Sequence, residues 1–217
     1  MGKKQKENEV ERILRAIQRI SYVKPQEVPN IDLYMDQVTT FMDQHLESTK
    51  RYSEDKLLTK TMINNYTKNN LLPSPQKKKY TKDHMYLLMY IYYLKNVLSI
   101  TDIQAILHPL SEQFFGGKGE ISLEEIYREI YRIEREQSVA VAKDIVRKYN
   151  ASRETFSGVK SEEERDYLKT FSYACMLSYD IYMKRQMLER LIDQELMPKE
   201  QEAKEEEQKP ENMEEGV

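Results

Sequence analysis

The stretch "DHMYLLMYIYYLKNVL", which begins at Asp83, constrains the fold more than any other part of this 217-residue chain. From Met85 to Leu94 it is apolar on nearly every side of a helix, and such a helix is buried either in a protein core or in a membrane. A run of about ten such residues is too short to cross a bilayer, which requires about 20. The segment therefore predicts the central helix of a protein core.

The composition favours further helices around this core. The chain has Met 11 and Tyr 16 but only Gly 6 and Pro 7, which is typical of long helices rather than of a turn-rich β fold. Apolar residues recur every three or four positions over residues 32–46 and again over 58–66. Ser99, with Asp102 three residues on, predicts the start of the next helix, and Pro109 and the glycine-rich loop after it are expected to close this unit. The predicted fold class is all-α.

The chain divides into four predicted parts. Residues 1–29 read as an amphipathic arm and a linker, residues 30–110 as the main domain, residues 120–197 as a helical dimerisation or effector region, and residues 198–217 as a disordered acidic tail. Two long amphipathic patterns in the third part could form a helical hairpin or a dimer surface. Their predicted inward residues are Leu123, Ile126, Ile130, Ile133, Val141 and Ile145 in the first pattern, and Leu168, Phe171, Cys175, Tyr182, Leu188, Leu191, Ile192 and Leu196 in the second.

Catalytic and metal-binding patterns are absent from the sequence. Cys175 is the only cysteine, and the three histidines are far apart, so neither a cysteine zinc site nor a spaced histidine pair can be built. We see no phosphate-binding glycine loop and no nucleophile elbow. We therefore expect no enzyme activity, no metal and no cofactor. With no export signal and no disulfide, the expected location is the cytoplasm, without a membrane partner.

The segment "LTKTMINNYTKNNLLPSP" carries the main functional signal. Thr59 is placed to cap a short helix, which Asn70 and Pro73 end. One side of this helix is apolar, whereas the other carries threonine, asparagine and lysine without glutamate. Lysine neutralises phosphates, and asparagine can both donate to and accept from a base edge, so this face suits a DNA duplex. The alternative is an ordinary solvated face.

The loop "PSPQKKKYT", just beyond this helix, places Lys77, Lys78 and Lys79 before Tyr80. Residues 48–82 contain nine basic and two acidic residues, a net +7 in a chain whose formal total is -3. Extending the window to residues 31–107 gives ten basic and eight acidic residues, only +2. One part of the domain is therefore basic, and its loop either contacts phosphates or is simply solvated.

The order of these features resembles the MerR-type winged helix-turn-helix. Thr59, Tyr66, "NNLLPSP", "KKKYT" and "SITDIQAIL" stand in that family's order, with Asn70 where it usually has glycine. The resemblance implies a recognition helix, a basic wing with at most a minimal β-sheet, and two further core helices. The elongated start with "VPNIDLYMDQV" is more similar to an uncharacterised bacterial family, domain of unknown function 1836, which implies a MerR-like DNA-binding domain but no known activity.

The predicted function is sequence-specific binding of double-stranded DNA by a homodimeric transcriptional regulator, since a two-fold pair can read two half-sites about one DNA turn apart. The alternative is a protein-interaction adaptor that uses the winged-helix core or the C-terminal helices. No effector can be named. The candidate DNA-binding residues are Thr59, Lys60, Thr61, Asn64, Asn65, Lys68, Lys77, Lys78, Lys79 and Tyr80.

Overall fold

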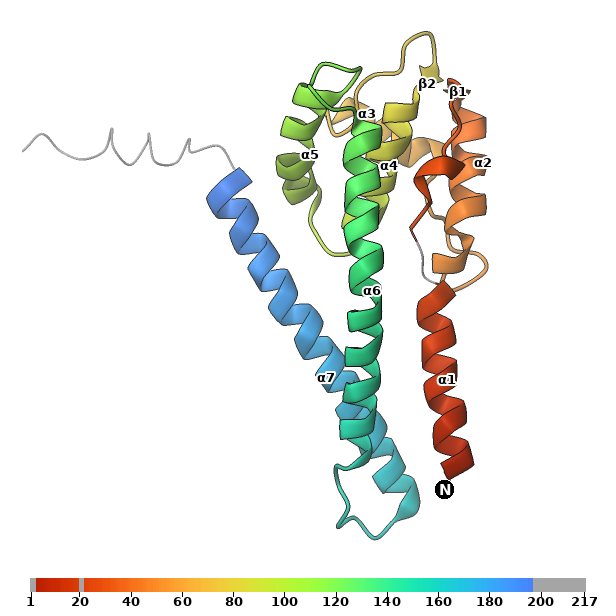
Figure 1. Ribbon diagram of the computed structural model, residues 1–217, viewed down its shortest axis with the longest axis vertical. Coiled ribbons are helices and arrows are strands. Elements are labelled where there is room, and N and C mark those ends of the chain that lie inside the picture. Colours follow the sequence, from red (N-terminus) through yellow and green to blue (C-terminus); the bar gives the residue numbers. More distant parts are fainter. Residues whose placement is uncertain (1–2, 20–21, 197–217) are drawn as a thin grey trace, which may run out of the picture.

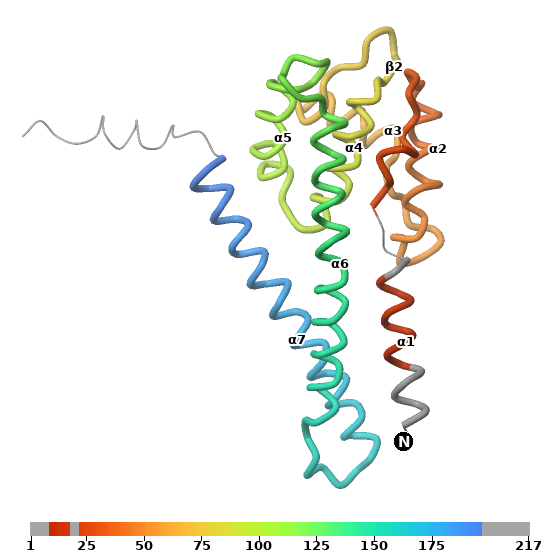
Figure 2. Tube along the Cα trace, viewed as in Figure 1, coloured from red at the N-terminus to blue at the C-terminus, as the bar shows by residue number. Residues whose placement is uncertain are grey.

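A computed structural model describes residues 3–19 and 22–196 of the chain, and it is mostly helical (Figures 1 and 2). The all-α prediction is confirmed, with one small antiparallel sheet; the predicted acidic tail lies outside the described residues. None of the helices in these two ranges is long and apolar enough to cross a membrane. In chain order the elements are α1 (Lys3–Arg19), η1 (Pro25–Glu27), β1 (Leu33–Tyr34), α2 (Met35–Leu46), η2 (Glu47–Thr49), α3 (Lys60–Lys68), β2 (Lys79–Tyr80), α4 (Lys82–Leu94), α5 (Ile100–Phe114), α6 (Leu123–Arg153), α7 (Glu162–Leu191) and the π-helical turn η3 (Ile192–Leu196).

Helix α4 forms the centre of the core, as its sequence predicts. Eight of its thirteen residues are buried, and the helix packs against α5, α6 and β2. Burial of a large apolar side chain stabilises a fold by about 1.5–3 kcal/mol, so this one helix contributes strongly. At its first turn, the Nδ1 atom of the buried His84 accepts the backbone N–H of Thr81 at 3.0 Å, which satisfies an otherwise unpaired donor.

Helix α3 begins and ends where the sequence predicts. The Thr59 hydroxyl accepts the backbone N–H of Met62 at 3.2 Å. At the other end, Asn70 takes a left-handed conformation with φ 54°, and the N–H groups of Leu71 and Leu72 both donate to the carbonyl of Tyr66. The helix is therefore closed at both ends by its own sequence.

The two strands join the basic loop to the start of α2. Leu33 pairs with Tyr80 and Tyr34 with Lys79. Residues 76–79 form a tight turn in which the Lys79 N–H donates to the Gln76 carbonyl at 2.9 Å, with Lys77 at φ 50° and Lys78 at φ 64°. Two successive residues with positive φ are characteristic of the type I′ hairpin turn. We call residues 76–79 the basic turn.

Two predicted boundaries are wrong. The helix predicted over residues 32–46 begins only at Met35, because Leu33 and Tyr34 extend to form β1. Pro109 does not close α5, which continues to Phe114. The other half of that prediction is confirmed, because the glycine-rich loop makes the break: Gly116 and Gly117 are both at φ 73°, and the Gly116 N–H donates to the Asp83 carboxylate at 2.8 Å.

The linker after α1 is attached to the core through the backbone of Val23. The Val23 N–H donates to the Tyr93 hydroxyl at 3.0 Å, and the Tyr127 hydroxyl donates to the Val23 carbonyl at 2.7 Å. Tyr93 extends from the end of α4 and Tyr127 from the start of α6. Two helices therefore hold both polar groups of one buried linker residue.

Helices α6 and α7 form the predicted helical hairpin, and they diverge towards the C-terminal end of α7 (Figure 1). Near the loop, Arg153 pairs with Asp166 at 3.2 Å, and Lys148 pairs with Asp180 at 3.4 Å. At the far end, Ile192 is fully buried and η3 packs against α5.

Many residues predicted to face inward on this hairpin are exposed. On α6, Leu123 is buried and Ile126 and Ile145 are half-buried, but the predicted stripe misses Tyr127, which is buried. On α7 and η3, Leu168 and Leu188 are half-buried and Ile192 is buried. The prediction is wrong for the remaining positions, which are exposed: Ile130, Ile133, Val141, Phe171, Cys175, Tyr182, Leu191 and Leu196.

Candidate nucleic-acid interface

Helix α3 presents one polar face to solvent. Ile63 and Tyr66 turn inward and are buried, which fixes the rotation of the helix. Thr59 lies half-buried at the N-cap with its hydroxyl engaged by the backbone. The predicted contact residues on the helix itself are all exposed: Lys60, Thr61, Asn64, Asn65 and Lys68.

Acidic residues lie beside the N-terminal end of this face. Asp36, in the first turn of α2, forms an ion pair with the ammonium group of Lys60, and both side chains are more than half exposed. An exposed pair of this kind contributes about 0–1 kcal/mol, so a phosphate can compete for the lysine. The sequence of α3 alone gives no sign of Asp36, because α2 reaches this position only through packing.

The basic turn brings further cations to the surface. Lys77 and Lys78 are exposed at its tip. Lys79 is half-buried, with its ammonium group 5.6 Å from the centre of the Tyr34 ring. Within the described ranges, no acidic side chain forms an ion pair with Lys68, Lys77 or Lys78. These three cations are therefore available to an external anion.

Tyr80 differs from the other candidates. Its side chain is only 3% exposed and lies against the ring of His84, with 5.4 Å between the ring centroids. Alternation along the strand turns Lys79 outward and Tyr80 inward. Tyr80 therefore anchors the basic turn to the core, and its ring is not part of the exposed surface. By the same alternation, Tyr34 is exposed beside the turn, although sequence reasoning did not select it.

Helix α2 is a common neighbour of α3 and of the strand that follows the basic turn. It packs against both α3 and β2. The loop before α3 is also ordered by its own side chains, since the Asp55 carboxylate accepts the N–H groups of Arg51 and Tyr52 at 3.1 and 3.0 Å. This acidic residue closes a loop, and with Asp43 and Glu54 it also lines a hollow of about 380 Å³ that includes Thr59 and Lys60 at the start of α3.

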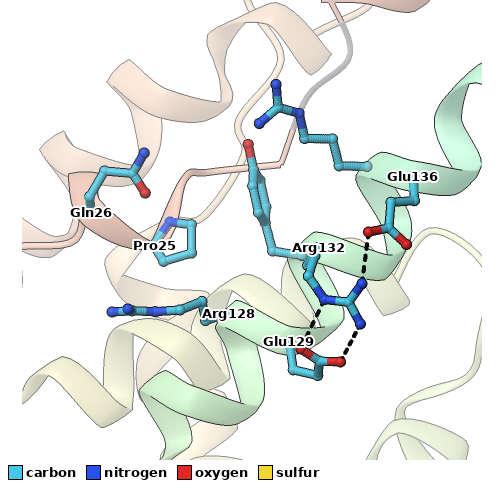
Figure 3. A pocket seen from close by; sticks show the side chains of 8 residues that line it. Pro25, Gln26, Arg128, Glu129, Arg132 and Glu136 are labelled. Atoms are coloured by element: carbon cyan, nitrogen blue, oxygen red, sulfur yellow. Dashed lines mark hydrogen bonds and ion pairs between the residues drawn. The ribbon is translucent and has the colours of Figure 1, made fainter.

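A hollow of about 700 Å³ between η1 and α6 gathers arginine and glutamate side chains (Figure 3). Arg132 donates to Glu129 and Glu136, which lie three residues before it and four after it on α6. The hydrogen bond from Arg132 lowers the pKa of Glu129. Arg128 pairs with Glu124 outside the lining, and the lining contains neither a histidine nor a cysteine.

A second hollow, of about 840 Å³, lies between α1 and α6. Its lining combines aliphatic residues with two tyrosines and several polar side chains, and it includes the half-buried Glu134, whose pKa is raised by burial although a hydrogen bond with Tyr22 lowers it. Its size is typical of a small-molecule pocket. It lies in the region for which the sequence predicts dimerisation or effector binding. Among the described residues, no group of three or more histidine, cysteine or acidic side chains could hold a metal ion.

Comparison with known proteins identifies one family. No curated protein and no solved structure matches the chain. Residues 23–130 match the model of a family described as a domain of unknown function, DUF1836. The match begins at the anchored Val23 and ends within α6, so it extends beyond both ends of the domain predicted at 30–110. The chain therefore carries a DUF1836 domain, which reaches from the linker after α1 to the first turns of α6.

Proposed function

We propose that the DUF1836 domain binds double-stranded DNA in a sequence-specific manner and that the protein acts as a transcriptional regulator. The observation that carries this proposal is the exposed Lys, Thr and Asn face of α3 together with a hairpin turn that holds two lysines at its tip. In the proposed complex α3 enters the major groove, as a recognition helix does, and the basic turn acts as a wing on the phosphates.

The chemistry of each part supports a separate role. Asn64 and Asn65 can donate to and accept from an adenine edge, whereas lysines supply charge without reading sequence. Lys77 and Lys78 keep left-handed conformations that cost a non-glycine residue roughly 1–2 kcal/mol each. Glycine or asparagine would fit this turn better. The presence of two lysines at these strained positions therefore supports a role for their charges.

Binding to random duplex pools, followed by sequencing of the bound fragments, tests the proposal directly. Enrichment of a common sequence is expected, and two-fold repeats in it would report a homodimer that reads two half-sites. If Lys60, Lys68, Lys77 and Lys78 meet phosphates, log affinity should fall with log salt at a slope of about −3.6. Absence of duplex binding at low salt would contradict the proposal.

Two variants separate base reading from phosphate binding. Asn64→Ala should relax sequence preference, whereas Lys78→Glu should weaken all duplexes alike. Lys118→Glu is the matched control, because Lys118 is exposed in the loop after α5 and makes the same charge change elsewhere. Asp36→Asn should strengthen binding, since it frees Lys60 and removes a negative charge near the duplex. If neither Asn64→Ala nor Lys78→Glu alters binding, the adaptor alternative becomes the better explanation.

A further inference from the structure

Within the part of the chain that the structure describes, no element covers the side of α7 that faces away from α6, and this side is largely uncharged. Both ribbon and tube views show α7 at the edge of the molecule (Figures 1 and 2). We call this side the outer face of α7; its six central residues, all exposed, are Tyr167, Phe171, Ala174, Cys175, Ser178 and Tyr182. The aromatic rings on it are 68%, 53% and 58% exposed in chain order.

Such a surface is unusual for a helix in water. Between residues 170 and 183 the only charged residue is Asp180, and its carboxylate turns towards α6, where it meets Lys148. A solvated helix normally carries charged side chains on its outward side. Contiguous exposed apolar surface in a folded protein indicates a binding partner. The outer face therefore requires an occupant.

The outer face has a tyrosine towards each end and small residues at its midpoint. The midpoint lies between Ala174 and Cys175, two small residues. Moving outward from it, Phe171 stands at the same distance as Ser178, and Tyr167 at the same distance as Tyr182. In an antiparallel pair of identical helices centred there, each phenylalanine would pack over a serine, and the small residues would meet where the helices cross.

The charges at the two ends decide the direction of pairing. Glu164 and Arg185 are also equally distant from the midpoint, and both lie on the outer face. Antiparallel pairing places the glutamate of one copy beside the arginine of the other. Parallel pairing would instead bring like charges together at both ends, which is destabilising.

We propose that a second copy of this chain docks on the outer face of α7 in an antiparallel, two-fold symmetric pair. Such an interface is isologous, because the same patch serves both copies. Aromatic side chains bury about 150–250 Å² each, so three rings that are more than half exposed contribute about 350 Å² per copy. The small residues between them and the charged ends extend the patch towards the roughly 800 Å² per partner of a stable interface.

This arrangement determines where the two DUF1836 domains lie. Ile192, which is buried next to α5, is 17 to 18 residues from the midpoint, or about 26 Å along the helix axis. The two domains would therefore attach at opposite ends of the α7 pair, at points about 50 Å apart. The pairing does not depend on DNA binding, so it can be tested, and can fail, without affecting the proposed function.

Phe171→Glu in the full chain tests the interface. By light scattering, the unaltered protein at tens of micromolar should have twice the 26.0 kDa chain mass, and Phe171→Glu should have the mass of one chain. Circular dichroism should stay unchanged, since this side chain is half exposed in the single chain. Val141→Glu is the matched control, because Val141 is an exposed apolar residue of α6 outside the outer face, and it should remain dimeric. A one-chain mass for the unaltered protein, or a monomeric Val141→Glu with a dimeric Phe171→Glu, would overturn the proposal.

Cross-linking tests whether the two α7 helices pair in the antiparallel or the parallel direction. Cys175, the only cysteine, lies beside the proposed two-fold axis, so mild oxidation should join two copies through it in native but not in urea-unfolded protein. In a Cys175→Ser background, a short bismaleimide should not cross-link two copies of the Glu164→Cys chain, nor two copies of the Arg185→Cys chain. In an equimolar mixture it should cross-link one Glu164→Cys chain to one Arg185→Cys chain. Joining of each variant to itself, with none between the two, would overturn antiparallel pairing.

Discussion

Replacement of Lys78 by glycine should make the protein more stable and at the same time weaken its binding to duplex DNA. Lys78 occupies the second central position of the basic turn with φ 64°. An L-residue pays roughly 1–2 kcal/mol for this conformation because its Cβ approaches the following carbonyl oxygen. Glycine adopts this conformation without strain, although the greater entropy of glycine in the unfolded chain cancels about 0.5–1 kcal/mol of the gain. The expected net gain in the free energy of unfolding is about 0.5–1 kcal/mol.

Thermal and urea unfolding can resolve this gain. In a chain of this length, 1 kcal/mol corresponds to about 2–4 °C in Tm, so an increase of about 1–4 °C is expected. The urea midpoint should rise with an unchanged slope, since the folded structure buries the same surface. In duplex binding, loss of one phosphate contact should reduce the salt slope by about 0.9.

Lys118→Gly is the control for this prediction. Lys118 is exposed in the loop after α5 and is not among the residues with positive φ, so glycine there gives no conformational relief. It removes the same charge and should lower stability slightly without changing duplex binding. If Lys78→Gly destabilises the protein as much as Lys118→Gly does, Lys78 is not left-handed in solution and the argument from conformational cost is refuted.

Three further substitutions test the core. Burial lowers the pKa of His84 in the folded protein, so as the pH falls below about 6.5 the unfolded chain takes up a proton before the folded chain does, and the free energy of unfolding should decrease. His84→Gln keeps an acceptor for the helix cap but does not titrate. The urea midpoint of this variant should therefore change less between pH 7 and pH 5 than that of the unaltered protein. Tyr127→Phe leaves the Val23 carbonyl without its donor and should cost about 1–3 kcal/mol in urea unfolding; a loss under 0.3 kcal/mol would contradict the anchoring role. Gly119→Ala places a Cβ 2.4 Å from the Phe114 ring and should lower Tm, whereas an unchanged Tm would show that the ring moves aside freely.

Elements with local signals were predictable from the sequence. The cap at Thr59, the left-handed Asn70 and the start of α5 at Ser99 each depend on residues within one turn of the helix end. The central position of α4 followed from its length and from apolar residues on all sides. Pro109 misled the prediction because a proline reduces helix stability without forbidding a helix that is held by its neighbours.

The candidate interface was predictable in part. Burial of Ile63 and Tyr66 on one side of α3 leaves its polar residues exposed, as the period of the sequence requires. The ion pair of Lys60 with Asp36 and the inward turn of Tyr80 depend on contacts between segments more than twenty residues apart. No local pattern encodes such contacts, because strand register and helix packing are set by the whole core.

Several residues of α7 that the sequence predicts to be buried are exposed, and this difference has a physical reason. A helical period shows that one side is apolar, but it does not show what covers that side. The core of this chain is already filled by α4 and its neighbours, and α7 uses the other side, with Tyr173 and Asp180, to contact α6. Phe171 and Tyr182 are therefore left in solvent within one chain. Since Tyr167 and Tyr182 are equally distant from the midpoint between Ala174 and Cys175, as are Glu164 and Arg185, a cover supplied by a second copy explains both the apolar pattern and the opposite charges at its ends.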